Sequence, residues 1–215
     1  MRSARRLGPW LRTPGTGTTR ERLLIWGNTV LAQAMLLLLA WLAGRSFGFR
    51  FFVPVGTRVR DAAAAAAALL ACFLLREAAR RLRTEEERRT MAVHRLAPRS
   101  ASEWAAWSVV AVAAAVAEEI AYRGVGVAVL QDWSGSLGLA ILVSATAFAV
   151  AHALQGWKSA VVIFGFALVM HALVLATGTL LFAMAVHLIY DVVAALAIAR
   201  EAVRFDRDAV TSVPG

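Results

Sequence analysis

Residues 159–190 read SAVVIFGFALVMHALVLATGTLLFAMAVHLIY and contain no Asp, Glu, Lys or Arg. As one α-helix these 32 residues would be about 48 Å long, whereas the hydrocarbon core of a bilayer is roughly 30 Å thick. The triplet Thr177-Gly178-Thr179 divides the run, because glycine commonly ends helices. The stretch therefore predicts two membrane-spanning helices, over residues 159–176 and 179–199.

Four further apolar segments lie upstream, over residues 23–44, 62–75, 104–131 and 137–154. The segment 62–75 has only fourteen residues, so it crosses a bilayer only if the arginines at its ends extend to the interfaces. We therefore predict an all-α fold: a polytopic membrane helical bundle with about six transmembrane helices.

The composition agrees with a membrane protein. Sixty per cent of the 215 residues are apolar and 17% are charged, whereas soluble domains are nearer one half and one quarter. The net charge of +9 is spread between apolar segments rather than gathered in one patch, so we expect no nucleic-acid partner. Cys72 is the one cysteine in the sequence, which excludes a disulfide framework and a cysteine-based metal site.

The distribution of basic residues predicts the topology. Segments 1–22, 76–99, 155–158 and 200–215 together hold 18 of the 23 Lys and Arg residues. Cytoplasmic loops of membrane proteins carry this excess, so both termini are predicted to be cytoplasmic. A chain rich in Arg and Ala with this bias is most typical of a multi-pass protein of a bacterial plasma membrane.

Four regions follow from this organisation. We predict a basic cytoplasmic segment over 1–22, two spans with a polar cytoplasmic loop over 23–99, a four-helix core over 100–199, and a polar tail over 200–215.

Ionisable residues inside the predicted spans mark the candidate site, because such groups are costly in a bilayer and are usually functional or paired. They are Glu118, Glu119, Arg123, His152, His187 and Asp191. Glu119 and Arg123 are four residues apart, as are His187 and Asp191, so each pair shares a helix face. Glu118 is rotated away from Glu119 by roughly 100°. We expect Glu118, His152 and the His187–Asp191 pair to face one interior cavity.

These residues can also be interpreted as structural, without a catalytic role. Glu119–Arg123 is interpreted as a structural ion pair, and His187 with Asp191 could form a polar clasp between helices. His171 lies in a span without a spaced acidic partner, so we predict a structural role for it. No function is predicted for His94, which lies in the polar loop.

Three motifs in order resemble the CPBP (Abi, CAAX-protease and bacteriocin-processing) family of intramembrane proteases. Glu118-Glu119-Ile-Ala-Tyr-Arg123 is similar to E-E-x-x-x-R, Phe148-Ala-Val-Ala-His152 to F-x-x-x-H, and His187-Leu-Ile-Tyr-Asp191 to H-x-x-x-[N/D]. The resemblance covers residues 98–196, and the first two predicted spans add only hydrophobicity to it.

The resemblance implies a protease of membrane proteins or peptides, including prenylated CAAX substrates, that works within the lipid bilayer. Glu118 would be the general base, helped by His152. His187 and Asp191 would bind the oxyanion, while Glu119 and Arg123 would order the first motif. Asp191 departs from the asparagine variant of the motif, because an ionised carboxylate cannot donate a hydrogen bond.

Three alternatives stay open at the level of sequence. A glutamate mechanism without cofactor is favoured, but Glu118, His152, His187 and Asp191 could also hold a zinc ion. A non-catalytic protein of the same fold, acting in bacteriocin immunity or stabilising a partner, would tolerate loss of Glu118. A transporter would also explain buried carboxylates, although no inverted repeat is evident.

Overall fold

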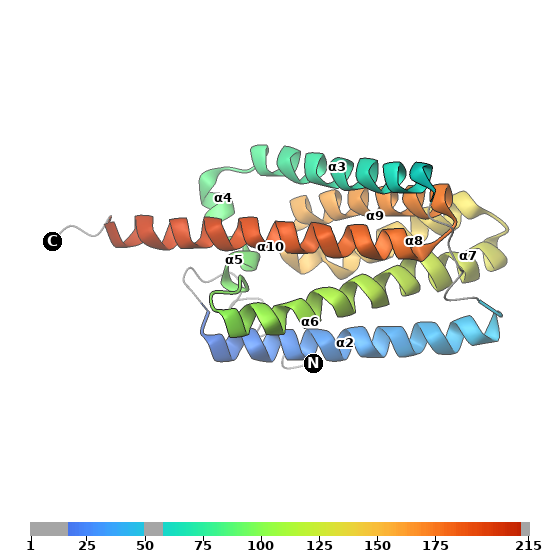
Figure 1. Ribbon diagram of the computed structural model, residues 1–215, viewed down its shortest axis with the longest axis horizontal. Helices are drawn as coiled ribbons and strands as arrows, with labels where there is room; N and C mark the ends of the chain where they lie inside the picture. Colours follow the sequence, from blue (N-terminus) through green and yellow to red (C-terminus); the bar gives the residue numbers. More distant parts are fainter. Residues whose placement is uncertain (1–16, 50–57, 212–215) are drawn as a thin grey trace.

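The computed structural model describes residues 17–49 and 58–211, and this part of the chain contains helices but no strand (Figure 1). The predicted all-α membrane bundle is therefore confirmed. Residues 1–16 of the predicted basic segment, residues 50–57, and the last four residues of the predicted tail lie outside the described ranges. The helices are α2 (Thr19–Ser46), α3 (Val59–Arg81), α4 (Glu85–Arg89), α5 (Ala92–Arg95), α6 (Ala101–Glu118), the π-helix η1 (Glu119–Gly126), α7 (Val127–Ser134), α8 (Leu137–Ala151), the 3₁₀ turn η2 (Ala153–Gln155), α9 (Trp157–Thr177) and α10 (Leu180–Thr211).

Most of the predicted spans correspond to long helices. Five helical stretches of the described residues are long and apolar enough to cross a membrane: Thr19–Ser46, Val59–Arg81, Ala101–Ser134, Trp157–Thr177 and Leu180–Asp208. The predicted segment 62–75 is extended at both ends to a helix of 23 residues, about 34 Å long. The break between α9 and α10 falls at Gly178, which adopts a left-handed φ of 69° that glycine reaches without strain.

The predicted fourth span is shorter than the sequence indicated. Helix α8 ends at Ala151 after 15 residues, about 22 Å, so Leu154 and His152 lie beyond its end. The His152 side chain explains the early stop, since its Nδ1 lies 2.8 Å from the Phe148 carbonyl oxygen, which a continuing helix would bond through the backbone. Gly156 then turns the chain with a φ of 94°.

The third apolar segment forms one continuous helical rod of α6, η1 and α7. Ser100 caps its first turn, since Ser100 Oγ accepts from the Glu103 backbone N–H at 3.3 Å. The rod changes to a π-helix at Glu119, directly after the first motif glutamate. The α-helical spacing of the sequence does not predict this change of winding.

The helices pack as neighbouring pairs around α10. Helix α2 lies along α6, α3 lies along α9, and α10 contacts both α3 and α6 (Figure 1). The main apolar core is formed by α3, α8, α9 and α10, and its fully buried members include Cys72, Ala145, Ala167, Met170 and Ala183. Small residues at these positions let the helix backbones approach closely, as is typical of membrane helices.

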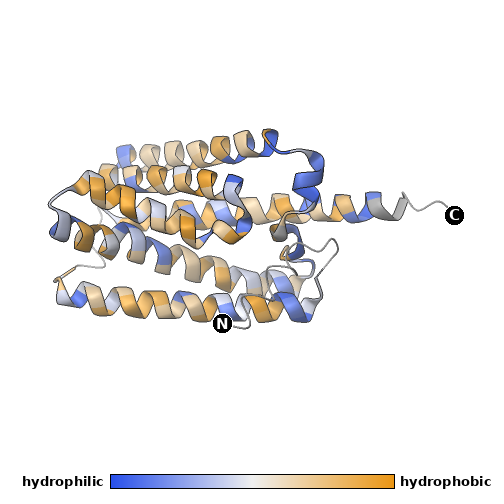
Figure 2. Cartoon of the chain, turned by 180° about the vertical axis from the view of Figure 1, so that it is seen from behind, coloured by the Kyte–Doolittle hydropathy of each residue, from blue (hydrophilic) through white to orange (hydrophobic). Residues whose placement is uncertain are grey.

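Hydrophilic residues are most numerous at the end of the bundle nearer the C-terminus, with fewer at the opposite end and mainly hydrophobic residues between (Figure 2). We call this the polar end: it comprises α4, α5, the first turns of α2, α6 and α9, and the part of α10 beyond residue 199. The predicted polar tail is not a separate element here, because α10 continues as a helix to Thr211. Ion pairs join it to α4 through Arg88–Glu201 and Arg89–Asp208, and to the loop before α6 through Arg99–Asp206.

The distribution of basic residues predicts that four segments lie on one side of the membrane. The described parts of these segments meet at this polar end. Lys158, at the start of α9, lies 2.7 Å from Glu87 of α4. This hydrogen bond holds the pKa of the Glu87 carboxyl below its usual range. Arg22 of α2 pairs with Glu103 of α6 in the same region. The contacts are consistent with one side for all four segments.

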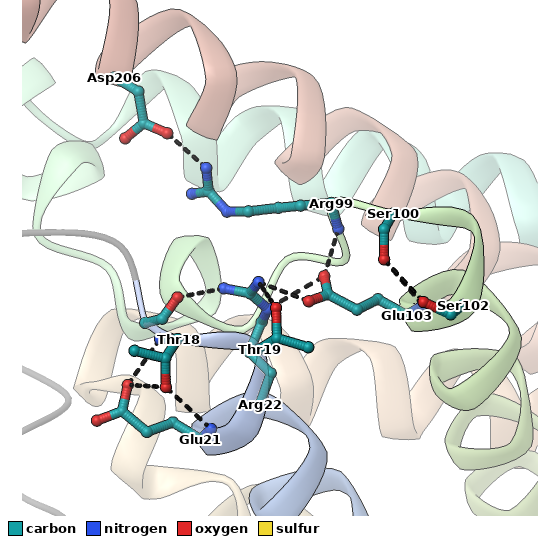
Figure 3. Close-up of polar contacts among 10 residues, drawn as sticks. Thr18, Thr19, Glu21, Arg22, Arg99, Ser100, Ser102, Glu103 and Asp206 are labelled. Atoms are coloured by element: carbon teal, nitrogen blue, oxygen red, sulfur yellow. Dashed lines mark hydrogen bonds and ion pairs between the residues drawn. The ribbon is translucent and has the colours of Figure 1, made fainter.

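A buried ion pair fastens α2 to α6 at the polar end (Figure 3). Arg22 Nη2 lies 2.7 Å from Glu103 Oε1, and the two side chains are 4% and 2% exposed. The other Glu103 oxygen accepts from Arg22 Nε at 3.2 Å and from the Arg99 backbone N–H at 2.7 Å. The Gly17 carbonyl and the Thr19 hydroxyl complete the partners of the guanidinium. The pair therefore fixes the first span against the helix that carries the motif.

Replacing Glu103 by Ala is expected to destabilise the fold by about 3–5 kcal/mol, because it leaves the Arg22 guanidinium buried without its counter-charge. Thermal unfolding of the purified protein in detergent measures the loss. Glu77→Ala is the matched control, since Glu77 pairs with exposed arginines of its own helix and such pairs contribute about 0–1 kcal/mol. Equal melting temperatures for the two variants would contradict the assignment.

Candidate active site

The predicted site residues line one cavity inside the bundle. Its volume is about 360 Å³, and Glu118, His152, His187 and Asp191 are all in its wall. Glu118 is the last residue of α6, His152 follows α8, and the other two lie on α10. Three segments that are separate in sequence therefore contribute polar groups to the same enclosed space, as the helical spacing predicted.

The second glutamate of the motif is fully buried and faces away from that cavity. Glu119 Oε1 lies 3.3 Å from Arg123 Nη1, and neither side chain is exposed at all. The same oxygen lies 2.8 Å from His187 Nδ1 on α10. Arg123 in turn stacks over the Phe148 ring, with Cζ 4.1 Å from the ring centroid, a cation–π contact that stabilises a buried guanidinium. Contacts within η1 and with α8 and α10 therefore hold the Glu119–Arg123 pair in place, which indicates a structural role for Glu119.

The π-helix makes this arrangement possible through its backbone. Winding with i→i+5 bonds leaves carbonyl groups displaced from their α-helical partners, and the Tyr122 carbonyl accepts from Ser144 Oγ of α8 at 2.6 Å. Gly126 is needed in this segment, because a Cβ there would lie 2.6 Å from the Ala121 carbonyl oxygen. The local backbone therefore binds α8 while presenting Glu118 and Glu119 in different directions.

Glu118 has a partner that sequence reasoning missed. Gln33, in the middle of α2, donates from Nε2 to Glu118 Oε1 at 2.5 Å and lines the same cavity. Helix α2, which carries none of the motifs, therefore supplies a polar group to the site. The available signal was an amide within an apolar run, which in a membrane span usually hydrogen-bonds across helices.

His187 lies between three carboxylates. Its Nδ1 is bound to Glu119, while Nε2 lies 3.6 Å from Asp191 Oδ2 and 3.9 Å from Glu118 Oε2. Because a carboxylate oxygen only accepts, Nδ1 carries the proton of that bond. Nε2 is then directed into the cavity beside the two acids that line it.

His152 is oriented by the same kind of bond at the end of α8. Its Nδ1 donates to the Phe148 carbonyl oxygen, so that in the neutral ring Nε2 is an acceptor. The ring also lies against Phe148, with centroids 4.7 Å apart. The early end of α8 thus places this imidazole in the cavity wall with one nitrogen left for a ligand.

The histidines outside the motifs have distinct environments. His171 is buried in α9 at 4% exposure and is not in the cavity wall, in line with the structural role predicted for it. His94, for which no role was predicted, does line the cavity, and its Nε2 lies 3.4 Å from Glu201. Burial lowers the pKa of His94, although the neighbouring Glu201 opposes this shift.

The alternative of a zinc site was tested against the side-chain geometry. Over residues 17–49 and 58–211, no group of three or more His, Cys, Asp or Glu side chains is placed to hold a metal ion. In this arrangement Glu118, His152, His187 and Asp191 do not form such a group.

Comparison with known proteins identifies the class to which this site belongs. Residues 100–193 match the family described as "Type II CAAX prenyl endopeptidase Rce1-like". The predicted resemblance to the CPBP family is confirmed over this range, which contains all seven motif residues. The matching family is described as a prenyl endopeptidase, and five helices of the described residues are long and apolar enough to cross a membrane. Neither a curated protein nor a solved structure matches the chain.

Arg123→Met is expected to destabilise the fold by about 3–5 kcal/mol, because it leaves Glu119 charged and buried without its cation. Thermal unfolding and the yield of folded protein in membranes measure the effect. The double variant Glu119→Gln/Arg123→Met removes both charges, keeps an acceptor for His187, and should recover most of the loss. A double variant as unstable as Arg123→Met would show that packing, rather than the unpaired charge, is responsible.

Proposed function

We propose that the chain is an intramembrane endopeptidase in which Glu118 activates water without a metal ion. The observation that carries the proposal is the division of labour between two adjacent glutamates. Glu119 is fully buried in bonds to Arg123 and His187, whereas Glu118 faces a cavity that also contains His152, His187 and Asp191. A carboxylate held in a cavity beside imidazoles is suited to general-base chemistry.

The first step is attack by water on the scissile carbonyl carbon. Glu118 takes a proton from the water while the oxygen forms the new bond to carbon, and His152 Nε2 accepts a hydrogen bond that orients the water. Gln33 Nε2 holds one oxygen of Glu118, which leaves Oε2 for the proton. Collapse of the tetrahedral intermediate breaks the C–N bond, and Glu118 returns the proton to the departing amine.

His187 is proposed to stabilise the oxyanion of that intermediate. With Nδ1–H bonded to Glu119, a second proton on Nε2 gives a cationic donor aimed into the cavity, where it would be worth more than in water. The three carboxylates around the ring, Glu118, Glu119 and Asp191, favour that cation. Asp191 is a second donor to the oxyanion when its carboxyl is protonated, or a partner that holds His187 when it is ionised.

The substrate is proposed to be a membrane-associated protein or peptide, with a prenylated C-terminal Cys-aliphatic-aliphatic-X segment as the candidate class. This follows from the printed description of the matching family and from a cavity enclosed by helices that are long enough to cross a bilayer. A bacterial plasma membrane, with both termini on the cytoplasmic side, is the location proposed from the arginine distribution.

Glu118→Gln is expected to reduce turnover by at least about a hundredfold, the scale of losing a general base. The residue keeps its size, so thermal unfolding should be nearly unchanged. The assay is cleavage of a membrane-peptide library by the purified protein, with a farnesylated CAAX peptide included, and Glu77→Gln on exposed α3 is the control.

Three outcomes would contradict this mechanism. Cleavage by Glu118→Gln at the parental rate would remove the base from its assigned role. Loss of parental activity on adding a chelator, with recovery on adding zinc, would favour a metal mechanism. No cleavage by the parent of any peptide would favour the non-catalytic alternative.

Asp191→Asn is expected to retain activity and to extend it to higher pH. An amide donates a hydrogen bond to the oxyanion at any pH, whereas a carboxyl donates only while it is protonated. Rates measured across pH, with and without chelator, test this. Activity that falls and is restored by zinc would identify a metal ligand. Activity that falls at every pH without rescue would instead make Asp191 the charge partner of His187.

A further inference from the structure

The cavity extends well beyond the residues of the motif. From Asp191 its wall follows α10 through Ala194 and Ile198 to Glu201 at the polar end. Ten residues of helix correspond to about 15 Å. The site described above therefore occupies one end of a longer space, and the other end lies among arginines of α3 and of the segment that follows it.

Four arginines line that second half of the cavity, and they differ in their partners. Arg80 is bonded to Glu77, and Arg88 to Glu201. Arg83 donates to the hydroxyl of Ser159 at 2.9 Å. Arg76 has no hydrogen bond or ion pair with any residue in the described ranges, although it is half-buried in the wall.

Two guanidinium groups thus face the cavity without a carboxylate of their own. The nearest acids are already engaged, because Glu87 is bonded to Lys158, and Glu201 to Arg88 and His94. A half-buried guanidinium is expected to be paired or hydrogen-bonded. Arg76 and Arg83 therefore point to an anionic ligand that enters this cavity.

Arg76 lies nearer the polar end of the bundle than the proposed reacting groups. Helices α3 and α10 run in the same direction (Figure 1), since Arg60 contacts the Ala176 carbonyl at one end and Arg88 pairs with Glu201 at the other. The Phe73 and Tyr190 rings, 5.5 Å apart, mark a common level. Arg76 follows Phe73 by three residues, so it begins about 4.5 Å nearer the polar end than Tyr190 and about 3 Å nearer than Asp191.

A short peptide fits between these levels. Three extended residues span about 10 Å, which is less than the roughly 15 Å from Asp191 to Glu201. The wall between them is partly apolar, with Ile163, Ala194 and Ile198, and would accept aliphatic side chains. A peptide cleaved beside Glu118, with three residues after the cut, would end between the levels of Arg76 and Glu201, in the part of the cavity wall that includes Arg76 and Arg83.

We infer that Arg76 and Arg83 bind the free α-carboxylate of the substrate and so set the distance of the cut from the C-terminus. This inference rests on the proposed function, since it assigns the ligand of the second half of the same cavity. Arginine suits the role because its planar fork bonds a carboxylate through two N–H groups. Arg83 would exchange its bond to Ser159 for one to the peptide.

The test compares two peptides that differ only in their last group. One farnesylated Cys-aliphatic-aliphatic-X peptide is made with a free carboxylate and again as the carboxamide, and both are offered to the full chain in phosphatidylcholine vesicles. The parent should cleave the acid with a kcat/KM about tenfold or more above that of the amide, the scale of a charge-assisted hydrogen bond. Arg76→Gln should lose most of this preference by slowing cleavage of the acid alone.

Arg81→Gln is the matched control on the same helix. Its side chain is 77% exposed and bonded to Glu77, and it is not part of the cavity wall. This variant should keep the parental preference for the acid. Arg76→Lys, which keeps the charge but not the fork, should retain part of it.

Binding of the same two peptides, measured by fluorescence anisotropy, separates this inference from the proposed function. Cleavage of acid and amide at equal rates would overturn the carboxylate site while leaving the protease intact. Arg76-dependent binding of the acid without any cleavage would support the site and contradict the protease. If the acid peptide is neither bound nor cleaved, the carboxylate site and the proposed protease function are both wrong.

An anionic lipid headgroup is the competing ligand for these arginines. The assay is therefore repeated in vesicles that contain phosphatidylglycerol. If Arg76→Gln lowers cleavage of acid and amide equally, and only in the anionic vesicles, the ligand is the lipid and the inference is wrong.

Discussion

The buried carboxylate of Glu119 is the constraint on which the rest of the site depends. A charge with no exposed surface is tolerated only when it is paired and hydrogen-bonded, and Glu119 meets both conditions through Arg123 and His187. One partner is on its own helix and the other is on α10. The pair of bonds therefore fixes the register of the motif helix against the last helix of the bundle, and it orients the ring of His187.

This constraint also explains why two adjacent glutamates have different surroundings. The π-helix that begins at Glu119 turns that side chain into the protein, while Glu118 ends the preceding α-helix and faces the cavity. Gln33 then holds Glu118 from the opposite side. The anchoring of α2 through Arg22 and Glu103 keeps Gln33 at that position. The Arg22–Glu103 ion pair at the polar end thus supports the hydrogen bond between Gln33 and Glu118 at the centre of the bundle.

The ion pairs of the polar end have a comparable effect on the rest of the cavity. Arg88 and His94 are held against Glu201, and Lys158 is held against Glu87. These pairs use the acids of the region and leave Arg76 and Arg83 without a carboxylate. The excess of basic residues that predicts the membrane topology therefore also makes this part of the cavity wall cationic.

The sequence by itself determined the class of fold and the composition of the site. Uncharged runs longer than a bilayer is thick permit only helices, because backbone groups must be bonded within each segment. The spacing of Glu118, Glu119 and Arg123, and of His187 and Asp191, sets which side chains share a face. Only the tertiary structure decided the bond from Gln33 to Glu118 and the absence of a carboxylate partner for Arg76 and Arg83. These features depend on contacts between residues far apart in the chain, and local hydrophobicity and helical periodicity carry no record of such contacts.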